Sequence, residues 1–142
     1  MAKPKIGFYW CASCGGCEEA VVDLAEVVLK VVEAAEIVLW PVAMDFKRDD
    51  VEALADGEMA VCFINGAIRT TEQMEMAELL RRKARLIVAF GSCAHTGGIP
   101  GLANLFARAE ILDTSYQTSP STVNPERTRP QAETATPEGT VT

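Results

Sequence analysis

Three cysteines, Cys11, Cys14 and Cys17, lie within the short segment WCASCGGCEEA, directly after an apolar run. Two residues separate each cysteine from the next, and this C-x-x-C spacing allows two sulfur atoms to converge on one metal centre. Gly15 and Gly16 stand between Cys14 and Cys17. Glycine adopts the positive φ angles of a tight turn and brings bare backbone amides close to sulfur. The segment therefore predicts a thiolate site, with a helix beginning at Cys17 that favours the ionised thiol.

Two further cysteines stand in different surroundings. Cys93 lies in the small-residue segment GSCAHTGG, which offers the same kind of permissive loop as the first cluster. Cys62 lies inside an apolar run at 59–64, where a free cysteine is usually a small buried hydrophobe. Cys93 is therefore the second candidate ligand-bearing position, and Cys62 is interpreted as part of the core.

Residue chemistry leaves three kinds of site open. A thioredoxin-like disulfide needs one C-x-x-C pair and has no use for Cys93. A tetrahedral zinc site needs two ligand pairs, and the second pair is missing here unless His95 contributes. An iron–sulfur cluster accepts thiolates from separated loops. We interpret His95 as a hydrogen-bonding residue beside a polar turn.

Composition excludes several classes of protein. The chain has 142 residues, 49% of them hydrophobic, which is enough for one domain with a substantial core. Its net charge of −7 argues against binding to nucleic acid or to anionic lipid. No run approaches the roughly 20 apolar residues that a membrane helix requires, and no signal segment is visible. We expect a cytoplasmic protein with reduced thiols.

Apolar runs and helical periodicities alternate along the chain. Strands are predicted at 5–10, 36–43, 59–64 and 85–90, and helices at 17–35, 49–54, 71–83 and 102–109. Thr70 and Gln73 form a capping-box pattern, and Asn65-Gly66 is a turn signal. Because the strands are apolar throughout, the pattern predicts an α/β, flavodoxin-like fold with a parallel sheet covered by helices on both faces. Both cysteine-bearing loops then follow the carboxyl ends of strands.

The composition changes towards the end of the chain. Residues 113–142 hold eight Thr and four Pro with few apolar residues, so alone they would not bury enough surface to offset their ordering entropy. We therefore predict a flavodoxin-like domain at 1–112, followed by a polar, extended or incomplete segment at 113–142.

Three segments carry a family resemblance: CASCGGCEEAVVDL, FINGAIRTTEQ and VAFGSCAHTGGIPGL. Together they closely resemble the small, iron–sulfur subunit of nickel–iron hydrogenases, in the cytosolic methyl-viologen-reducing branch found with heterodisulfide reductase. The resemblance covers residues 3–137 and implies that Cys14, Cys17 and Cys93 ligate the 4Fe-4S cluster nearest the nickel–iron centre. The family's fourth ligand lies in a later G-C-P segment, which this sequence lacks. We expect a truncated chain, with Cys11 either as a spare thiol or as a thiol that lies behind the ligands.

The resemblance also implies a role. The large subunit would oxidise hydrogen, and this oxidoreductase subunit would pass single electrons to an acceptor subunit of heterodisulfide reductase type, without being catalytic alone. Glu18 would face the large subunit as a proton relay, although an acid that complements the helix dipole is the simpler interpretation. Trp10 and Trp40 are interpreted as core or interface aromatics.

Two alternatives to the hydrogenase role remain. One is a cluster-bearing subunit of an NADH:quinone oxidoreductase, a family that typically has adjacent cysteines where this sequence has Cys14-Gly15-Gly16-Cys17. The other is a cluster-free α/β binding module whose thiols serve zinc or redox chemistry.

Overall fold

Four parallel strands form the central sheet of the computed structural model, which describes residues 2–137 and 139–141. The strand order is β2-β1-β3-β4, and the strands are β1 (Lys5–Trp10), β2 (Glu36–Leu39), β3 (Met59–Asn65) and β4 (Ala84–Phe90). The chain order of the strands reverses between β1 and β3, as in doubly wound α/β folds. The predicted flavodoxin-like α/β fold is therefore confirmed.

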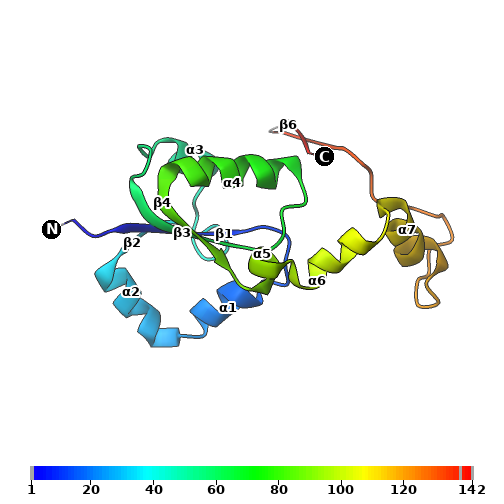
Figure 1. The fold of residues 1–142 in the computed structure, drawn as a ribbon, viewed down its shortest axis with the longest axis horizontal. Coiled ribbons are helices and arrows are strands. Elements are labelled where there is room, and N and C mark those ends of the chain that lie inside the picture. Colours follow the sequence, from blue (N-terminus) through cyan, green and yellow to red (C-terminus); the bar gives the residue numbers. More distant parts are fainter. Residues whose placement is uncertain (1, 138, 142) are drawn as a thin grey trace.

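Helices cover both faces of this sheet (Figure 1). One face carries α1 (Gly16–Val22), the 3₁₀ turn η1 (Ala25–Val27) and α2 (Val28–Ala34), and the other carries α3 (Arg48–Glu52) and α4 (Thr71–Lys83). Side chains alternate between the two faces along each strand. Phe8 packs with Trp40 and Phe63 on the α1–α2 side, whereas Cys62 and Ile64 pack with Leu80 on the α4 side.

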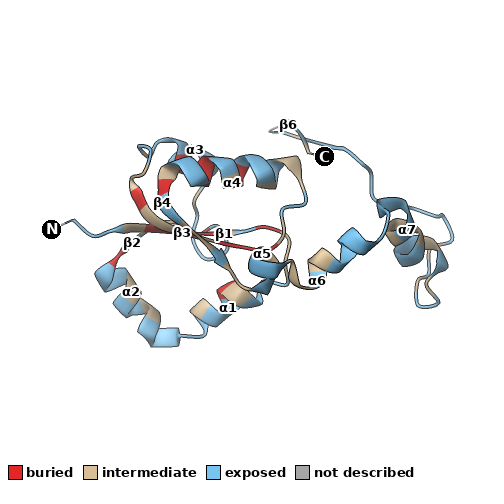
Figure 2. Ribbon diagram, in the orientation of Figure 1, coloured by how far each residue is buried: buried red, intermediate tan, exposed pale blue. Residues whose placement is uncertain are grey.

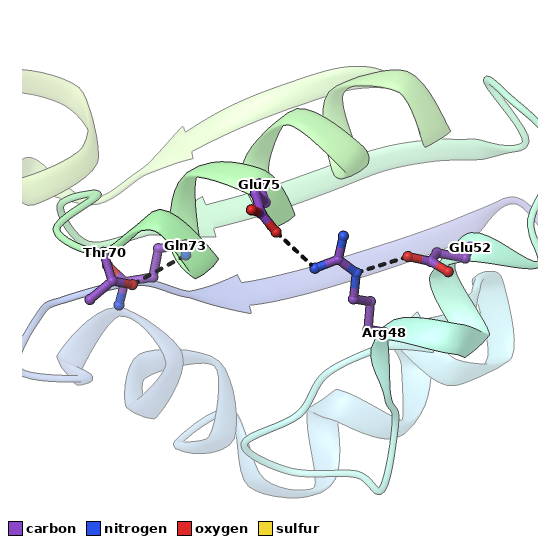
Figure 3. Close-up of polar contacts among 5 residues, drawn as sticks. All are labelled: Arg48, Glu52, Thr70, Gln73 and Glu75. Carbon is purple, nitrogen blue, oxygen red and sulfur yellow. Dashed lines mark hydrogen bonds and ion pairs between the residues drawn. The ribbon is translucent and has the colours of Figure 1, made fainter. Parts of the chain in front are cut away.

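The helix α4 is fixed at its start and along its exposed face (Figure 3). The Thr70 hydroxyl accepts a hydrogen bond from the Gln73 amide, as predicted, while the Gln73 side chain accepts from the amide of Arg69. Arg48 on α3 pairs with both Glu52 and Glu75, which ties α3 to α4. These ion pairs are half-exposed, so each contributes at most about 1 kcal/mol.

Two predicted elements differ in extent. The strand predicted at 36–43 ends at Leu39, shortly before Pro41, which has no backbone N–H for a sheet ladder. The helix predicted at 17–35 is broken around Ala25, whose φ of 49° is left-handed. The run is rich in valine, a weak helix former, and the break lets Val21 and Val28 pack on the same core.

After β4 the chain runs outward from the sheet to α7 and then turns back (Figure 1), and its short elements are mostly exposed (Figure 2). They are α5 (Ser92–Thr96), α6 (Gly98–Gly101), η2 (Leu102–Leu105), α7 (Arg108–Asp113), η3 (Thr114–Thr118) and the antiparallel pair β5 (Thr134–Thr136) and β6 (Gly139–Val141). The helix predicted at 102–109 is interrupted, because Phe106 is extended and Glu110 caps the free amide of Ala107. No helix in the described ranges is long and apolar enough to cross a membrane.

Burial predicts where leucine matters for stability. Leu80, a residue of α4, is fully buried, whereas Leu105 is 74% exposed. Leu80→Ala should lower the free energy of unfolding by about 2 to 5 kcal/mol, since it leaves a cavity in the core. Leu105→Ala, the matched control, should change it by less than about 0.5 kcal/mol. Urea denaturation of both variants measures the difference, and equal losses would contradict the assigned core.

Candidate metal centre

Three loops meet at the carboxyl edge of the sheet. The cysteine-rich segment follows β1, and Gly66 and Ala67 follow β3. Cys93 lies just after β4, within the short helix α5 and not in the loop that was predicted. Because β3 lies between β1 and β4, its loop is flanked by the other two. The reversal of strand order between β1 and β3 is the position at which open α/β sheets bind ligands.

The loops after β1 and β3 are joined through their backbones. Ala12 and Ala67 exchange two backbone hydrogen bonds, of 3.0 and 2.8 Å, as an isolated antiparallel bridge. Gly66 has a φ of 88°, and a Cβ at this position would lie 2.8 Å from the backbone carbon of Cys11. A side chain at Gly66 would therefore push the loops apart, so the two backbones approach closely at the Asn65-Gly66 pair predicted as a turn.

Cys17, in the first turn of α1, contacts the segment that follows β4. A Cβ built on Gly91 would lie only 2.1 Å from the Cys17 sulfur, so the sulfur occupies the space that a side chain would fill. Gly91 also has a φ of 84°, and it stands two residues before Cys93. The Cys93 sulfur in turn lies against Gly98, where a Cβ would be 3.2 Å away.

Burial divides the five cysteines into two groups. Cys14 is exposed and Cys17 and Cys93 are half-buried, whereas Cys11 and Cys62 are buried. Burial raises the pKa of the Cys11 thiol to about 11 and that of Cys62 to about 12. Burial therefore disfavours the thiolate form of both side chains. The interpretation of Cys62 as a core residue is confirmed.

The thiols near the sheet edge fit an iron–sulfur cluster in their chemistry. Among residues 2–137 and 139–141, no three His, Cys, Asp or Glu side chains are gathered closely enough to hold a metal ion. The contact of Cys17 with Gly91 nevertheless joins the loops that carry the predicted ligands. Soft thiolates from separated loops are the ligands that such clusters take. Which sulfurs bind metal stays a prediction.

A hollow of about 270 Å³ lies beside the exposed thiol of Cys14. Its wall includes Trp10, Glu18, Val22 and Val42. A larger hollow of about 400 Å³ runs along η2 and α7, and its lining contains no thiol: Leu102, Ala103, Phe106, Glu110, Ile111, Thr114 and Ser115. Of these two hollows, the smaller one is therefore lined by a thiol that could bind a metal.

A chain of polar side chains beneath the cysteine loop was not predicted. Asn65, fully buried at the end of β3, accepts a hydrogen bond from the Ser13 hydroxyl at 2.9 Å and donates to Glu18 at 2.8 Å. Ser13 also accepts from the Trp10 indole and the Gly15 amide. The Trp40 indole donates to the second oxygen of Glu18 at 2.8 Å. The pair Asn65-Gly66 is typical of a turn, so the sequence did not indicate that the Asn65 side chain is buried and hydrogen-bonded.

Glu18 is only 2% exposed and points inward from the first turn of α1. Both of its carboxylate oxygens accept hydrogen bonds, so it does more than complement a helix dipole at the surface. Trp40 is a core aromatic as predicted, and Trp10 is 39% exposed beside the hollow. His95 is exposed on α5.

The comparison with known families agrees with this geometry. The sequence profile of the family described as NADH ubiquinone oxidoreductase, 20 Kd subunit, matches residues 14–138, which include Cys14, Cys17 and Cys93. The chain belongs to this 20 Kd subunit family. Its curated relatives include hydrogenase subunits, which are oxidoreductases.

Two curated relatives and one solved structure support the resemblance to hydrogenase small subunits. The iron-sulfur subunit of the F420-non-reducing hydrogenase of Archaeoglobus profundus is 41% identical over 89% of this chain and 40% of its own length. A subunit of the F420-non-reducing hydrogenase of Methanothermobacter thermautotrophicus is 38% identical over 98% of this chain and 44% of its own length. The crystal structure of an NAD+-reducing [NiFe]-hydrogenase in the H2-reduced state has a TM-score of 0.75 and 26% identity, covering 97% of this chain and 70% of that chain.

The chain thus spans about two-fifths of the length of these curated relatives. The predicted resemblance to hydrogenase small subunits is confirmed. The similarity extends over nearly the whole chain, including the segment after the sheet.

Thiol reactivity should follow burial in the metal-free, reduced chain. At pH 8 iodoacetamide should modify Cys14 first, and it should leave Cys11 and Cys62 largely unmodified, because a pKa of about 11 or 12 keeps them protonated. Raising the pH through these values, or unfolding the chain, should restore their labelling. Peptide mass spectrometry measures the order of labelling, and early labelling of Cys62 would contradict the assigned burial.

Gly91→Ala should disturb the contact between the two cysteine loops. The new Cβ would overlap the Cys17 sulfur and require a left-handed alanine, so we expect a loss of about 1 to 3 kcal/mol in stability. Gly101→Ala is the matched control, since its Cβ would meet nothing within 4 Å. Thermal unfolding of the two variants measures the contrast, and a Gly91→Ala protein as stable as Gly101→Ala would refute the contact.

Proposed function

We propose that this chain is the electron-transfer part of a nickel–iron hydrogenase small subunit, with Cys14, Cys17 and Cys93 as ligands of a proximal 4Fe-4S cluster. The observation that carries the proposal is the contact of the Cys17 sulfur with Gly91, next to the loop of Cys93. The hydrogenase names of the relatives support the same role. Such a cluster takes up and releases one electron at a time.

The chain's own residues prepare the site for a charged group. The glycines around the thiols leave backbone amides uncovered by side chains, and the Gly15 amide is already held by Ser13. The Trp10 ring lies 3.2 Å from the position of a Cβ on Gly15 and covers that side of the turn. A fourth ligand would come from outside the Cys14, Cys17 and Cys93 set.

We further propose that the hydrogenase large subunit docks over the hollow beside Cys14. Val22 and Val42, about half-exposed, line this hollow with Trp10. Exposed apolar side chains next to a candidate cluster suit a protein interface better than water. Electrons would then leave through an acceptor subunit of heterodisulfide reductase type, in the cytoplasm. In this proposal residues 1–112 form the cluster domain and 113–142 a separate polar segment.

The description of the 20 Kd subunit family supports a second candidate, a cluster-bearing subunit of an NADH:quinone oxidoreductase-like complex. The two glycines between Cys14 and Cys17, where that class typically has adjacent cysteines, favour the hydrogenase role. A cluster-free module remains the competing class of protein.

Anaerobic reconstitution with ferrous iron and sulfide tests the proposed ligands. The wild-type chain should turn brown and take up iron and sulfide in equal amounts, approaching about four irons per chain. Cys14→Ser, Cys17→Ser and Cys93→Ser should each lose most of this iron, because each removes a thiolate. Cys11→Ala and Cys62→Ala are controls that should retain it. A colourless chain that binds zinc instead, or iron uptake unaffected by Cys93→Ser, would contradict the proposal.

A further inference from the structure

Asn65 contacts the residues on both sides of the C-x-x-C turn. Ser13 directly precedes Cys14, and Glu18 directly follows Cys17. The Asn65 side chain accepts from the Ser13 hydroxyl at 2.9 Å and donates to the Glu18 carboxylate at 2.8 Å. One amide group therefore holds both ends of the turn that carries two of the proposed ligands.

The sheet fixes this amide in place. Asn65 is the last residue of β3 and is paired in register with Trp10 on β1 and Phe90 on β4. The backbone carbonyl of Asn65 accepts a hydrogen bond of 2.8 Å from the amide of Cys11, and the whole residue is buried. The strands therefore fix the backbone of Asn65, and its side-chain amide also lies 3.4 Å from the carbonyl oxygen of Tyr9 on β1.

Packing alone does not account for these polar groups. A buried carboxylate is unfavourable unless it is fully hydrogen-bonded, and apolar residues of similar size would fill the same space. Here both oxygens of Glu18 are satisfied, one by Asn65 and one by the Trp40 indole. Hydrogen bonds to an ionised carboxylate are stronger and more directional than neutral ones. These hydrogen bonds therefore fix the relative positions of the side chains in addition to filling the core.

We propose that Asn65 is a positioning residue that sets the separation and orientation of the Cys14 and Cys17 sulfurs for a shared metal centre. The inference rests on the proposed function of these thiols. The donor end of the amide faces Glu18, and its acceptor end faces the Ser13 hydroxyl. Mutation of residues that support metal ligands through hydrogen bonds typically lowers metal affinity by about 10- to 100-fold.

Reversal of the amide and the carboxylate gives a specific test. Asn65→Asp removes the donor to Glu18 and places two carboxylates against each other. Adding Glu18→Gln restores a donor–acceptor pair with the same net charge, since the new amide can donate to Asp and still accept from Trp40. Asn104→Asp, the same change on the exposed η2, is the matched control.

The probe is Co²⁺ added to the reduced, metal-free full chain under anaerobic conditions, read by its thiolate charge-transfer absorption. Asn65→Asp should weaken Co²⁺ binding by about tenfold or more and change the absorption spectrum. The double variant Asn65→Asp/Glu18→Gln should recover most of the affinity and the wild-type spectrum. Asn104→Asp should behave as wild type. A purely structural role would lower the melting temperature and leave the affinity and spectrum of the folded chain unchanged.

Ser13→Ala is a milder second variant, which keeps the inference testable should Asn65→Asp not fold. It removes the Ser13 hydroxyl, with its hydrogen bonds to Asn65, the Trp10 indole and the Gly15 amide. The contact between Asn65 and Glu18 stays in place. Ser13→Ala should therefore weaken Co²⁺ binding several-fold and alter the spectrum, with a smaller loss in melting temperature than Asn65→Asp. Wild-type affinity and spectrum in Ser13→Ala and Asn65→Asp, or a double variant no better than Asn65→Asp, would overturn the positioning role. If the wild-type chain itself gives no thiolate absorption with Co²⁺, the proposed metal site fails, whatever the variants do.

Discussion

The candidate site depends on the close approach of three loop backbones at one edge of a parallel sheet. Parallel strands all end on the same side, so the sheet brings the residues after β1, β3 and β4 to one edge without any ligand. The loops can approach this closely because glycine has no side chain. Gly66 lies against the backbone of Cys11, and Gly91 lies against the sulfur of Cys17. These glycines have positive φ angles, so alanine is disfavoured there both by contact and by backbone conformation.

The same edge explains why cysteines so near in sequence differ so much. Cys11 is at the end of a strand and is buried, which raises its thiol pKa to about 11. Cys14, three residues later, is exposed beside a hollow lined with apolar side chains. The chain leaves the sheet between them, and a turn joined to β3 through Ser13 and Asn65 carries the second thiol outward. A buried core thiol and an exposed potential ligand can therefore lie three residues apart in one segment.

Much of this arrangement could be predicted from the sequence. Continuous apolar runs predicted the strands, and their alternation with helical periodicity predicted the doubly wound sheet and the edge at which Cys14, Cys17 and Cys93 lie. Local sequence patterns were less informative where tertiary contacts determine the backbone conformation. The break near Ala25 has no glycine or proline to announce it, and it follows from packing two short helices on one sheet face. The pair Asn65-Gly66 has the composition of a turn, and only the fold reveals the buried amide and the backbone contact.

The central claim is that sulfurs from two distant loops share one cluster at the sheet edge. Anomalous diffraction at the iron absorption edge, from crystals of the anaerobically reconstituted chain, tests it most directly. The account predicts iron bonded to the sulfurs of Cys14, Cys17 and Cys93, with Cys11 and Cys62 unligated in the core. Iron bound to Cys11 or Cys62, or iron held by the first loop with Cys93 remote from it, would contradict the account.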